Sequence, residues 1–340
     1  MRCLQWSYFD GRKTDIQNYA LHEIATPLSG LLNVAFAGIH LDFATESIDI
    51  RTTKKGQISL GRKKSETTRE LDLTHNRVKD LPLPEGRADR LLEVMGIATP
   101  DGQVKPTRRA KFNQVNEFLK QLSHAIADAD LAALGRPIEI LDCGCGCGSS
   151  YLTLAAHHYL NNILHFPARL LGVDVNDSLV RASTDRAAHL EADGVTFSQG
   201  RIGRNVTSPV HDSGFRPDIV LALHACDTAT DDAIIEAVRN DAKLFLGVPC
   251  CHRHLNRQLR REGPNPMAPL LAHGILRERQ ADLLTDTFRA TALRIAGYRT
   301  DVVEFISAED TARNLMIRAV RSGPKHDPRD LAEFTALKAF

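Results

Sequence analysis

The sequence predicts an α/β protein with a doubly wound, mostly parallel sheet of seven strands and a smaller N-terminal α+β accessory domain. Two observations support this fold class. From residue 138 onward, short apolar segments alternate with longer amphipathic ones, the order of elements that builds a parallel sheet. The first apolar segment, 138–142, also breaks into closely spaced glycines and reopens as an apolar-periodic helix. Such a turn predicts a bound ligand at the carboxyl end of the sheet.

The length of 340 residues suits about two domains. The proline-flanked segment 100–106 is the expected boundary, which gives an accessory domain over 1–104 and the sheet domain over 105–322. Residues 323–340 form a polar tail with a weakly helical end. Hydrophobic residues make up 43% of the chain and the net charge is +1, so bulk charge points to no class of partner.

Two features of the chain predict a cytoplasmic protein with no membrane partner. The start, 1–15, lacks the apolar core of a signal sequence, and no stretch approaches 18 uninterrupted apolar residues. The seven cysteines are an odd number, and six lie in three tight groups beside expected strand ends. This pattern fits site chemistry better than a disulfide framework, so we expect reduced thiols.

In the accessory domain we expect a hairpin where isoleucines at 48, 50 and 58 flank a Lys-Lys-Gly-Gln turn. Residues 51–64 carry six Lys and Arg and no acid. They form either a solvated hairpin face or a contact with a nucleic-acid backbone. Further basic residues lie within 105–111, so both segments are expected RNA contacts.

The sheet domain opens with an amphipathic helix over 107–127, whose apolar stripe is expected to pack on the sheet. The last two strands have no helix between them, which predicts one antiparallel edge. The expected strands are 138–142, 170–175, 195–198, 218–224, 243–248, 300–306 and 314–320, and the expected helices between them are 151–160, 178–192, 230–239 and 281–296.

The stretch IEILDCGCGCGSS, residues 138–150, contains the pattern D-x-G-x-G-x-G. It is not the dinucleotide pattern G-x-G-x-x-G, because Ser149 stands where the last glycine would be. It resembles the nucleotide-binding motif of class I S-adenosylmethionine-dependent methyltransferases. The resemblance implies a Rossmann-like methyltransferase fold and S-adenosylmethionine as the cofactor, held by Asp142, Gly144, Gly146 and Gly148. The alternative is a tight turn that holds nothing.

Two further cofactor contacts follow from the same resemblance. Asp174 ends the second strand, where a carboxylate accepts hydrogen bonds from both ribose hydroxyls; the alternative is an ordinary N-cap of the next helix. After the third strand the family often has an acid, but this chain has Arg201. Adenine recognition is therefore expected to depend on backbone groups and Ile202.

Cysteine- and histidine-bearing loops follow the fourth and fifth strands, at 224–231 and 249–254. These strands are neighbours in a doubly wound sheet, so both loops overhang the expected methyl donor. HACDTATD and PCCH are similar to the paired motifs of a broad methyltransferase family with L-H-x-C and C-C-H signatures, and to eukaryotic acceptor-stem tRNA 2′-O-methyltransferases. Asp227 and Arg253 depart from the tRNA pattern. The resemblance covers residues 105–320.

Three kinds of role are open for these loops. Asp227, Asp231 and His252 are candidate general bases, although Asp227 also suits a helix start. Cys250 or Cys251 is a candidate thiolate nucleophile, as in cytosine-C5 methyltransferases. Cys226, Cys250, Cys251 and His252 have side chains that ligate zinc, but C-x-x-C spacing is absent and we assign no metal. Small polar residues lining the pocket are the remaining option, and His224 is placed with the cofactor contacts.

The sequence thus predicts methyl transfer from S-adenosylmethionine, with RNA as the acceptor at a ribose 2′-oxygen or a base. A base amino group is disfavoured, because no Asn/Asp/Ser-Pro-Pro-aromatic motif follows the fourth strand. The alternatives are a small-molecule or protein methyltransferase, and a non-catalytic protein that binds S-adenosylmethionine or a metal.

Overall fold

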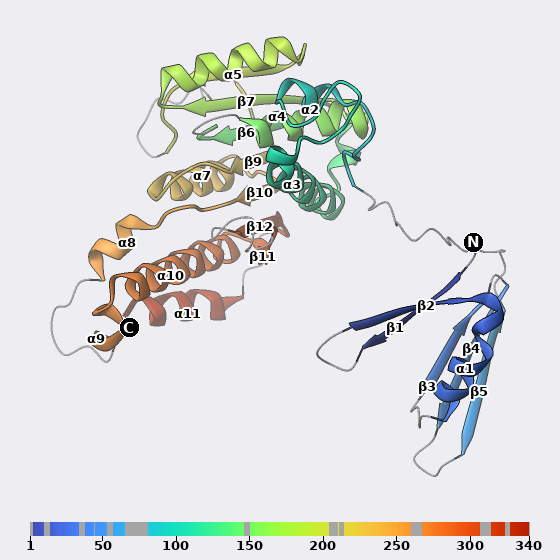
Figure 1. The fold of residues 1–340 in the computed structure, drawn as a ribbon. Helices are drawn as coiled ribbons and strands as arrows, with labels where there is room; N and C mark the ends of the chain where they lie inside the picture. The colour runs from blue at the N-terminus through green and yellow to red at the C-terminus, as the bar shows by residue number, and fades with distance from the viewer. Residues whose placement is uncertain are drawn as a thin grey trace. The chain divides into compact units, whose positions relative to one another are not determined.

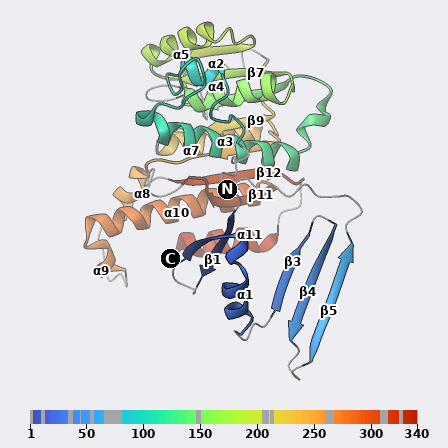
Figure 2. The same cartoon turned by 45° about the vertical axis from the view of Figure 1, so that its right-hand side comes forward.

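The computed structural model describes residues 3–9, 14–33, 38–43, 45–52, 57–64, 81–145, 150–203, 210, 214–259, 267–306, 314–323 and 327–339. The chain divides into two compact units, Met1–Val78 and Lys79–Phe340. Figures 1 and 2 show the elements of both. Within the described residues, no helix is long and apolar enough to cross a membrane.

The first unit is a small α+β domain, as predicted. Strands β1 (Cys3–Phe9) and β2 (Thr14–Ala20) form an antiparallel pair, followed by a 3₁₀ turn (Leu21–Glu23) and helix α1 (Ala25–Leu32). Strands β3 (Gly38–Asp42), β4 (Glu46–Thr52) and β5 (Ile58–Lys64) form an antiparallel sheet. The predicted hairpin is the β4–β5 pair, with Thr52 opposite Ile58; its turn, including Lys54 and Lys55, lies outside the described residues.

The second unit contains the predicted mostly parallel sheet, with seven strands in its described part. Their order is β11-β12-β10-β9-β6-β7-β8. The first strand, β6, has its successor β7 on one side and β9 on the other, so the chain direction reverses there. The bounds are β6 Ile138–Cys143, β7 Ala168–Asp174, β8 Val195–Gln199, β9 Ile219–Ala222, β10 Leu244–Gly247, β11 Tyr298–Glu304 and β12 Leu315–Arg321.

The expectation of an antiparallel edge needs correction. Strand β12 is the antiparallel strand, but it lies between β10 and β11 and not at the edge. The chain leaves β10, passes through the long helix α10 (Gly274–Ile295), and forms β11 one strand position away from β10. Strand β12 then returns as the second strand of a hairpin and occupies the position between β10 and β11. The edge strand β11 therefore runs parallel to β10.

Helices cover both faces of this sheet. On one face, α3 and α4 pack over inward side chains such as Ile140, Leu221 and Leu246. On the other, α7 and α10 pack over Leu141, Val220 and their neighbours. The bounds are α2 Arg90–Val94, α3 Arg109–Asp128, α4 Tyr151–His158 with a π-helical extension Tyr159–Ile163, α5 Asp177–His189, α7 Thr228–Arg239, α8 Arg253–Gln258, α9 Ala268–Leu271, α10 Gly274–Ile295 and α11 Pro328–Ala339; 3₁₀ turns span Pro106–Arg108 and Leu131–Leu134.

Both ends of the sheet domain differ from the boundaries expected at 104/105 and 322/323. Residues 79–104 belong to the second unit, because Leu91, Leu92 and Ile97 are buried in the core shared with α3 and α4. At the C-terminus, α11 packs on α10 instead of forming a free tail. Phe334 makes an edge contact with Phe288, and Asp330 lies 2.8 Å from Arg294 Nε.

Candidate functional site

Asp142 lies near the carboxyl end of β6 and its side chain is fully buried. One carboxylate oxygen, Oδ2, accepts a hydrogen bond from the Thr153 hydroxyl on α4, whereas buried Oδ1 has no hydrogen-bond partner among the described residues. The pKa of Asp142 is raised to about 7, mainly by burial; the Thr153 hydrogen bond opposes this rise, and the nearby charge of Asp174 contributes to it. A buried oxygen without a partner at this edge marks a place for a donor or cation from outside the chain.

Gly144 begins the glycine-rich turn in a conformation that requires glycine. Its φ is +75°, and a Cβ added there would lie 3.3 Å from the Cα of Ala225, in the loop after β9. The Gly144 N–H donates to the Val173 carbonyl over 2.8 Å. The turn after β6 is therefore in contact with the loop after β9, which carries Cys226.

Two of the predicted glycines, Gly146 and Gly148, lie outside the described residues, as does Cys147. Cys143 and Cys145 are buried, and burial is the main cause that raises the pKa of each thiol. They remain predicted small spacers of the turn.

Asp174 ends β7 and is half-buried, with Oδ1 accepting the Asn176 N–H over 2.9 Å. The N-cap of helix α5 is Asn176, whose side chain accepts the Ser178 N–H over 3.0 Å. Asp174 is therefore not the cap of α5, which was the alternative to a ribose contact. Ile202 follows β8 and is half-buried against the α7 face, and Arg201 is exposed.

Side chains from three elements gather around His224, at the end of β9. Its ring lies 6.3 Å from the ring of Tyr151, and burial lowers the pKa of His224. The Tyr151 hydroxyl donates to Gln114, and Lys111 Nζ lies 4.9 Å from the Tyr151 ring centre. Sequence reasoning missed Tyr151 and Gln114; the position of Tyr151 directly after the glycine turn was the available indication.

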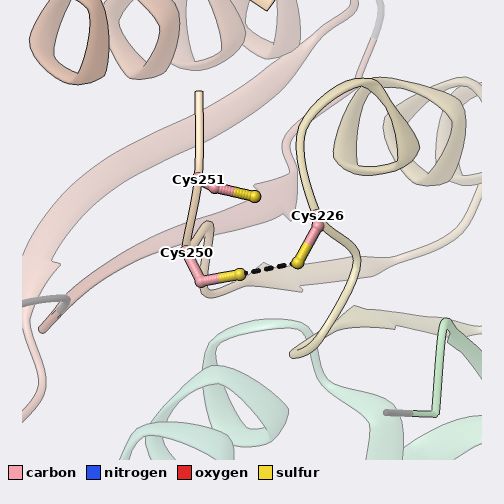
Figure 3. A group of neighbouring side chains, drawn as sticks. All are labelled: Cys226, Cys250 and Cys251. Carbon is pink, nitrogen blue, oxygen red and sulfur yellow. Dashed lines mark hydrogen bonds between the residues drawn. The ribbon is translucent and has the colours of Figure 1, made fainter. Parts of the chain in front are cut away.

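The loops after β9 and β10 bring three cysteines together, as the strand order predicts (Figure 3). Sγ atoms of Cys226, Cys250 and Cys251 all lie within 4.8 Å of one another, and those of Cys226 and Cys250 are 2.9 Å apart. The hydrogen bond between these two lowers the pKa of Cys250 and raises that of Cys226. Cys226 is exposed and the other two are half-buried.

A buried charged network on α10 holds both loops. His252 lies between two carboxylates, with Nδ1 2.8 Å from Asp282 Oδ1 and Nε2 2.9 Å from Asp286 Oδ1. Arg289, which is 3% exposed, contacts Asp286 and also donates from Nε to Asp231 Oδ1 over 2.7 Å. Sequence reasoning missed Asp282, Asp286 and Arg289, although their i, i+4, i+7 spacing on one helix face was visible.

This network bears on the three candidate bases. Both ring nitrogens of His252 face carboxylates, and Asp231 pairs with Arg289, which favours positioning roles for these two residues. Asp227 occupies the N-cap position of α7, yet its side chain makes no cap hydrogen bond there. Its Oδ1 accepts the His254 N–H over 2.9 Å instead. Asp227 thus connects the two loops and remains the candidate base nearest to Cys226 in the chain.

Residues 110–258, which include every one of these loops, match the protein family described as a methyltransferase domain. The matched residues lie within the second unit. The match confirms the predicted enzyme class. No curated protein matches the chain.

Solved structures similar to the methyltransferase domain share little sequence with it. A ribosomal protein L11 methylase from Lactobacillus delbrueckii subsp. bulgaricus is 15% identical, with a TM-score of 0.33 over 60% of this chain and 79% of that one. An rRNA methylase from Streptococcus thermophilus is 10% identical (TM-score 0.35; 58% and 95%). Fibrillarin from Aeropyrum pernix, in complex with S-adenosyl-L-methionine, is 15% identical (TM-score 0.33; 80% and 94%).

Proposed function

We propose that the methyltransferase domain transfers a methyl group from S-adenosylmethionine to RNA. The observation that carries the cofactor assignment is the buried, unpartnered Oδ1 of Asp142 at the carboxyl end of the first strand, beside a glycine turn. S-adenosylmethionine carries ammonium and sulfonium cations and supplies an electrophilic methyl group. A cationic group satisfies an orphaned carboxylate oxygen, so the residues present fit this cofactor.

The remaining cofactor contacts follow from the positions of the strand ends. Asp174 presents a carboxylate one strand away from Asp142, suited to a pair of ribose hydroxyls. The absence of a side chain at Gly144 lets the glycine turn pack directly against Ala225 of the loop after β9. Ile202 offers an apolar surface for the adenine. The chain contributes to methyl transfer by aligning the acceptor with the methyl group and excluding water, with Asp227 as the proposed base.

RNA as the acceptor is supported by a group of cations beside this edge. Lys111 has its pKa lowered by burial, then by the charges of Arg108 and Arg186, so the three cations lie near one another. These like charges repel one another, and a bound polyanion such as RNA relieves this repulsion. Tyr151 and His224 add rings beside Lys111 on which a base can stack. The likeness of the two cysteine loops to tRNA 2′-O-methyltransferase motifs points to the same acceptor.

The first unit carries further exposed basic residues on both faces of its β4–β5 pair. Arg51 and Lys63 lie on one face, and Arg62 and Lys64 lie on the other. We propose that one of these faces adds sequence-independent contacts to the phosphate backbone.

The test is incubation of the full chain with methyl-labelled S-adenosylmethionine and, separately, total RNA, protein and metabolite fractions. Label in RNA is the expected result, and nucleoside analysis then distinguishes ribose from base methylation. In the double variant Arg108→Ala/Arg186→Ala, the negative slope of log affinity for RNA against log salt should become shallower by about 1 to 2. Arg181→Ala is the control, because Arg181 lies on α5 with Arg186 but pairs with Asp177.

Two outcomes would contradict the proposal. Label confined to the protein or metabolite fraction would reject RNA as the acceptor while keeping the cofactor. Cofactor binding without label in any fraction would favour the non-catalytic alternative.

A further inference from the structure

Three thiol groups from two separate loops form one cluster at the carboxyl edge of the sheet. Cys226 follows β9, and Cys250 and Cys251 follow the neighbouring strand β10 (Figure 3). The sulfur of Cys251, like that of Cys250, points toward the loop that carries Cys226 (Figure 3). The methyl-transfer chemistry proposed above uses none of the three sulfur atoms.

We propose that Cys226, Cys250 and Cys251 bind one zinc ion through three thiolates, with the fourth coordination position open to an exchangeable ligand. Thiolates are the ligands that select zinc among the common divalent ions. Three protein ligands with an open fourth position are typical of catalytic rather than structural zinc sites. Across the described part of the chain, no further His, Cys, Asp or Glu joins this group, so none of these residues occupies the fourth position.

The sulfur positions are compatible with a single ion. Two thiolates on a tetrahedral zinc, each about 2.3 Å from the metal, lie about 3.8 Å apart. The Cys226 and Cys250 sulfurs are 2.9 Å apart, and all three sulfurs lie within 4.8 Å of one another. Changes of about 1 Å in these separations, within reach of cysteine χ1 rotation, place all three around one metal. A Cys226–Cys250 disulfide would use two of the three thiols and leave Cys251 beside it without a role.

The surroundings hold the cluster in place, as the outer shell of a metal site does. The Asp227 N–H donates to the Cys251 carbonyl over 3.2 Å, which joins the two loops directly. His252 follows Cys251, and its Nε2 hydrogen-bonds Asp286 of α10 over 2.9 Å. His252 is not part of the group of three ligand atoms, so it acts as a support and not as a fourth ligand. This differs from the four-ligand set considered from the sequence.

The loop that carries Cys226 also packs against the glycine turn. Ala225, which contacts the turn at Gly144, immediately precedes Cys226. The zinc assignment does not depend on the proposed function, because metal content is measured without turnover.

The test begins with metal analysis of the full chain purified without chelator. We expect one zinc ion per chain, and at least a tenfold loss of zinc affinity in each of Cys226→Ser, Cys250→Ser and Cys251→Ser. Cys3→Ser is the matched control, because Cys3 lies in β1 of the other unit, and it should keep full zinc content. Circular dichroism of each variant separates loss of the metal from loss of the fold.

Cobalt substitution of the wild-type protein provides a second readout that needs no variant. Thiolate ligation predicts a strong sulfur-to-cobalt charge-transfer band, and addition of a small thiol should change the visible cobalt bands if the fourth position is open. A spectrum unaffected by the thiol would overturn the open position. Wild-type protein that takes up no zinc, zinc retained in all three variants, or a Cys226–Cys250 disulfide in protein prepared without oxygen would overturn the site.

Discussion

Arg289 donates a hydrogen bond from Nη2 to the backbone carbonyl of Asp227 over 2.6 Å. The same guanidinium contacts Asp231 and Asp286, so one side chain of α10 reaches the loop after β9 and the residue that fixes His252. The geometry of both cysteine loops therefore depends on a helix that carries none of the cysteines.

Replacing Arg289 should destabilise the second unit strongly. Arg289→Met leaves the buried carboxylate of Asp286 without its cation, which we expect to lower the free energy of unfolding by about 3 kcal/mol. Arg299→Met is the control, because Arg299 pairs with Asp128 on the surface and should cost about 1 kcal/mol or less. Urea unfolding measures both. A loss in Arg289→Met no larger than in the control would show that the network does not stabilise the fold.

Asp142 should make stability fall with rising pH. Burial raises its pKa from 3.8 to about 7, so between these values the native protein keeps a proton that the unfolded chain has released. The Asp142 contribution is therefore full below about pH 4 and is lost as the pH rises to about 7, by as much as about 4 kcal/mol. Urea unfolding across this range should show that Asp142→Asn removes this decline. Parallel wild-type and variant curves would contradict the assignment.

Gly144→Ala should weaken cofactor binding. The substitution forces a non-glycine residue to φ +75° and brings its Cβ to 3.3 Å from Ala225, which displaces the turn. We expect S-adenosylmethionine affinity, measured by calorimetry, to fall at least tenfold. Gly135→Ala is the matched control, with φ +65° and no atom within 4 Å of the added Cβ. It should lose about 1 kcal/mol of stability and keep its affinity. Equal affinities in the two variants would count against the turn as the binding site.

Asp174 and Asn176 should separate binding from helix capping. Asn176→Ala removes the N-cap of α5 and should cost about 1 kcal/mol of stability without changing affinity for S-adenosylmethionine. Asp174→Asn should do the reverse, with a loss of affinity of about tenfold and little change in stability, because a ribose acceptor is lost. If Asp174→Asn changed only the unfolding transition, Asp174 would be structural.

The sheet and the convergence of the loops could be predicted because both follow from local patterns and one topological rule. Apolar segments 138–142 and 170–175 match β6 and β7 to within two residues, and 218–224 contains β9. Parallel neighbours then bring Cys226 near Cys250. The place of β12 could not be predicted in this way. A hairpin with β11 satisfies the sequence whether β12 lies at the edge or inside, and its pairing with β10 decides the matter.

The side chains that hold the site escaped prediction for a different reason. Asp282, Asp286 and Arg289 share one face of α10, a pattern that also describes an ordinary solvated helix face. Their significance depends on burial against His252 and Asp231, which are distant in the sequence. Asp174 shows the opposite case. Two readings were open, and a capping hydrogen bond two residues later, at Asn176, removed one of them.

The dependence of the cysteine loops on α10 also sets an order of assembly during synthesis. The ribosome releases the glycine turn and both loops before the segment that contains Asp286 and Arg289. A nascent chain that ends before α10 therefore has the strands that bind a cofactor but not the cations and carboxylates that fix Asp227 and His252. The proposed acceptor side therefore forms only after α10 has been synthesised, so chains truncated within α10 should lack an ordered acceptor side.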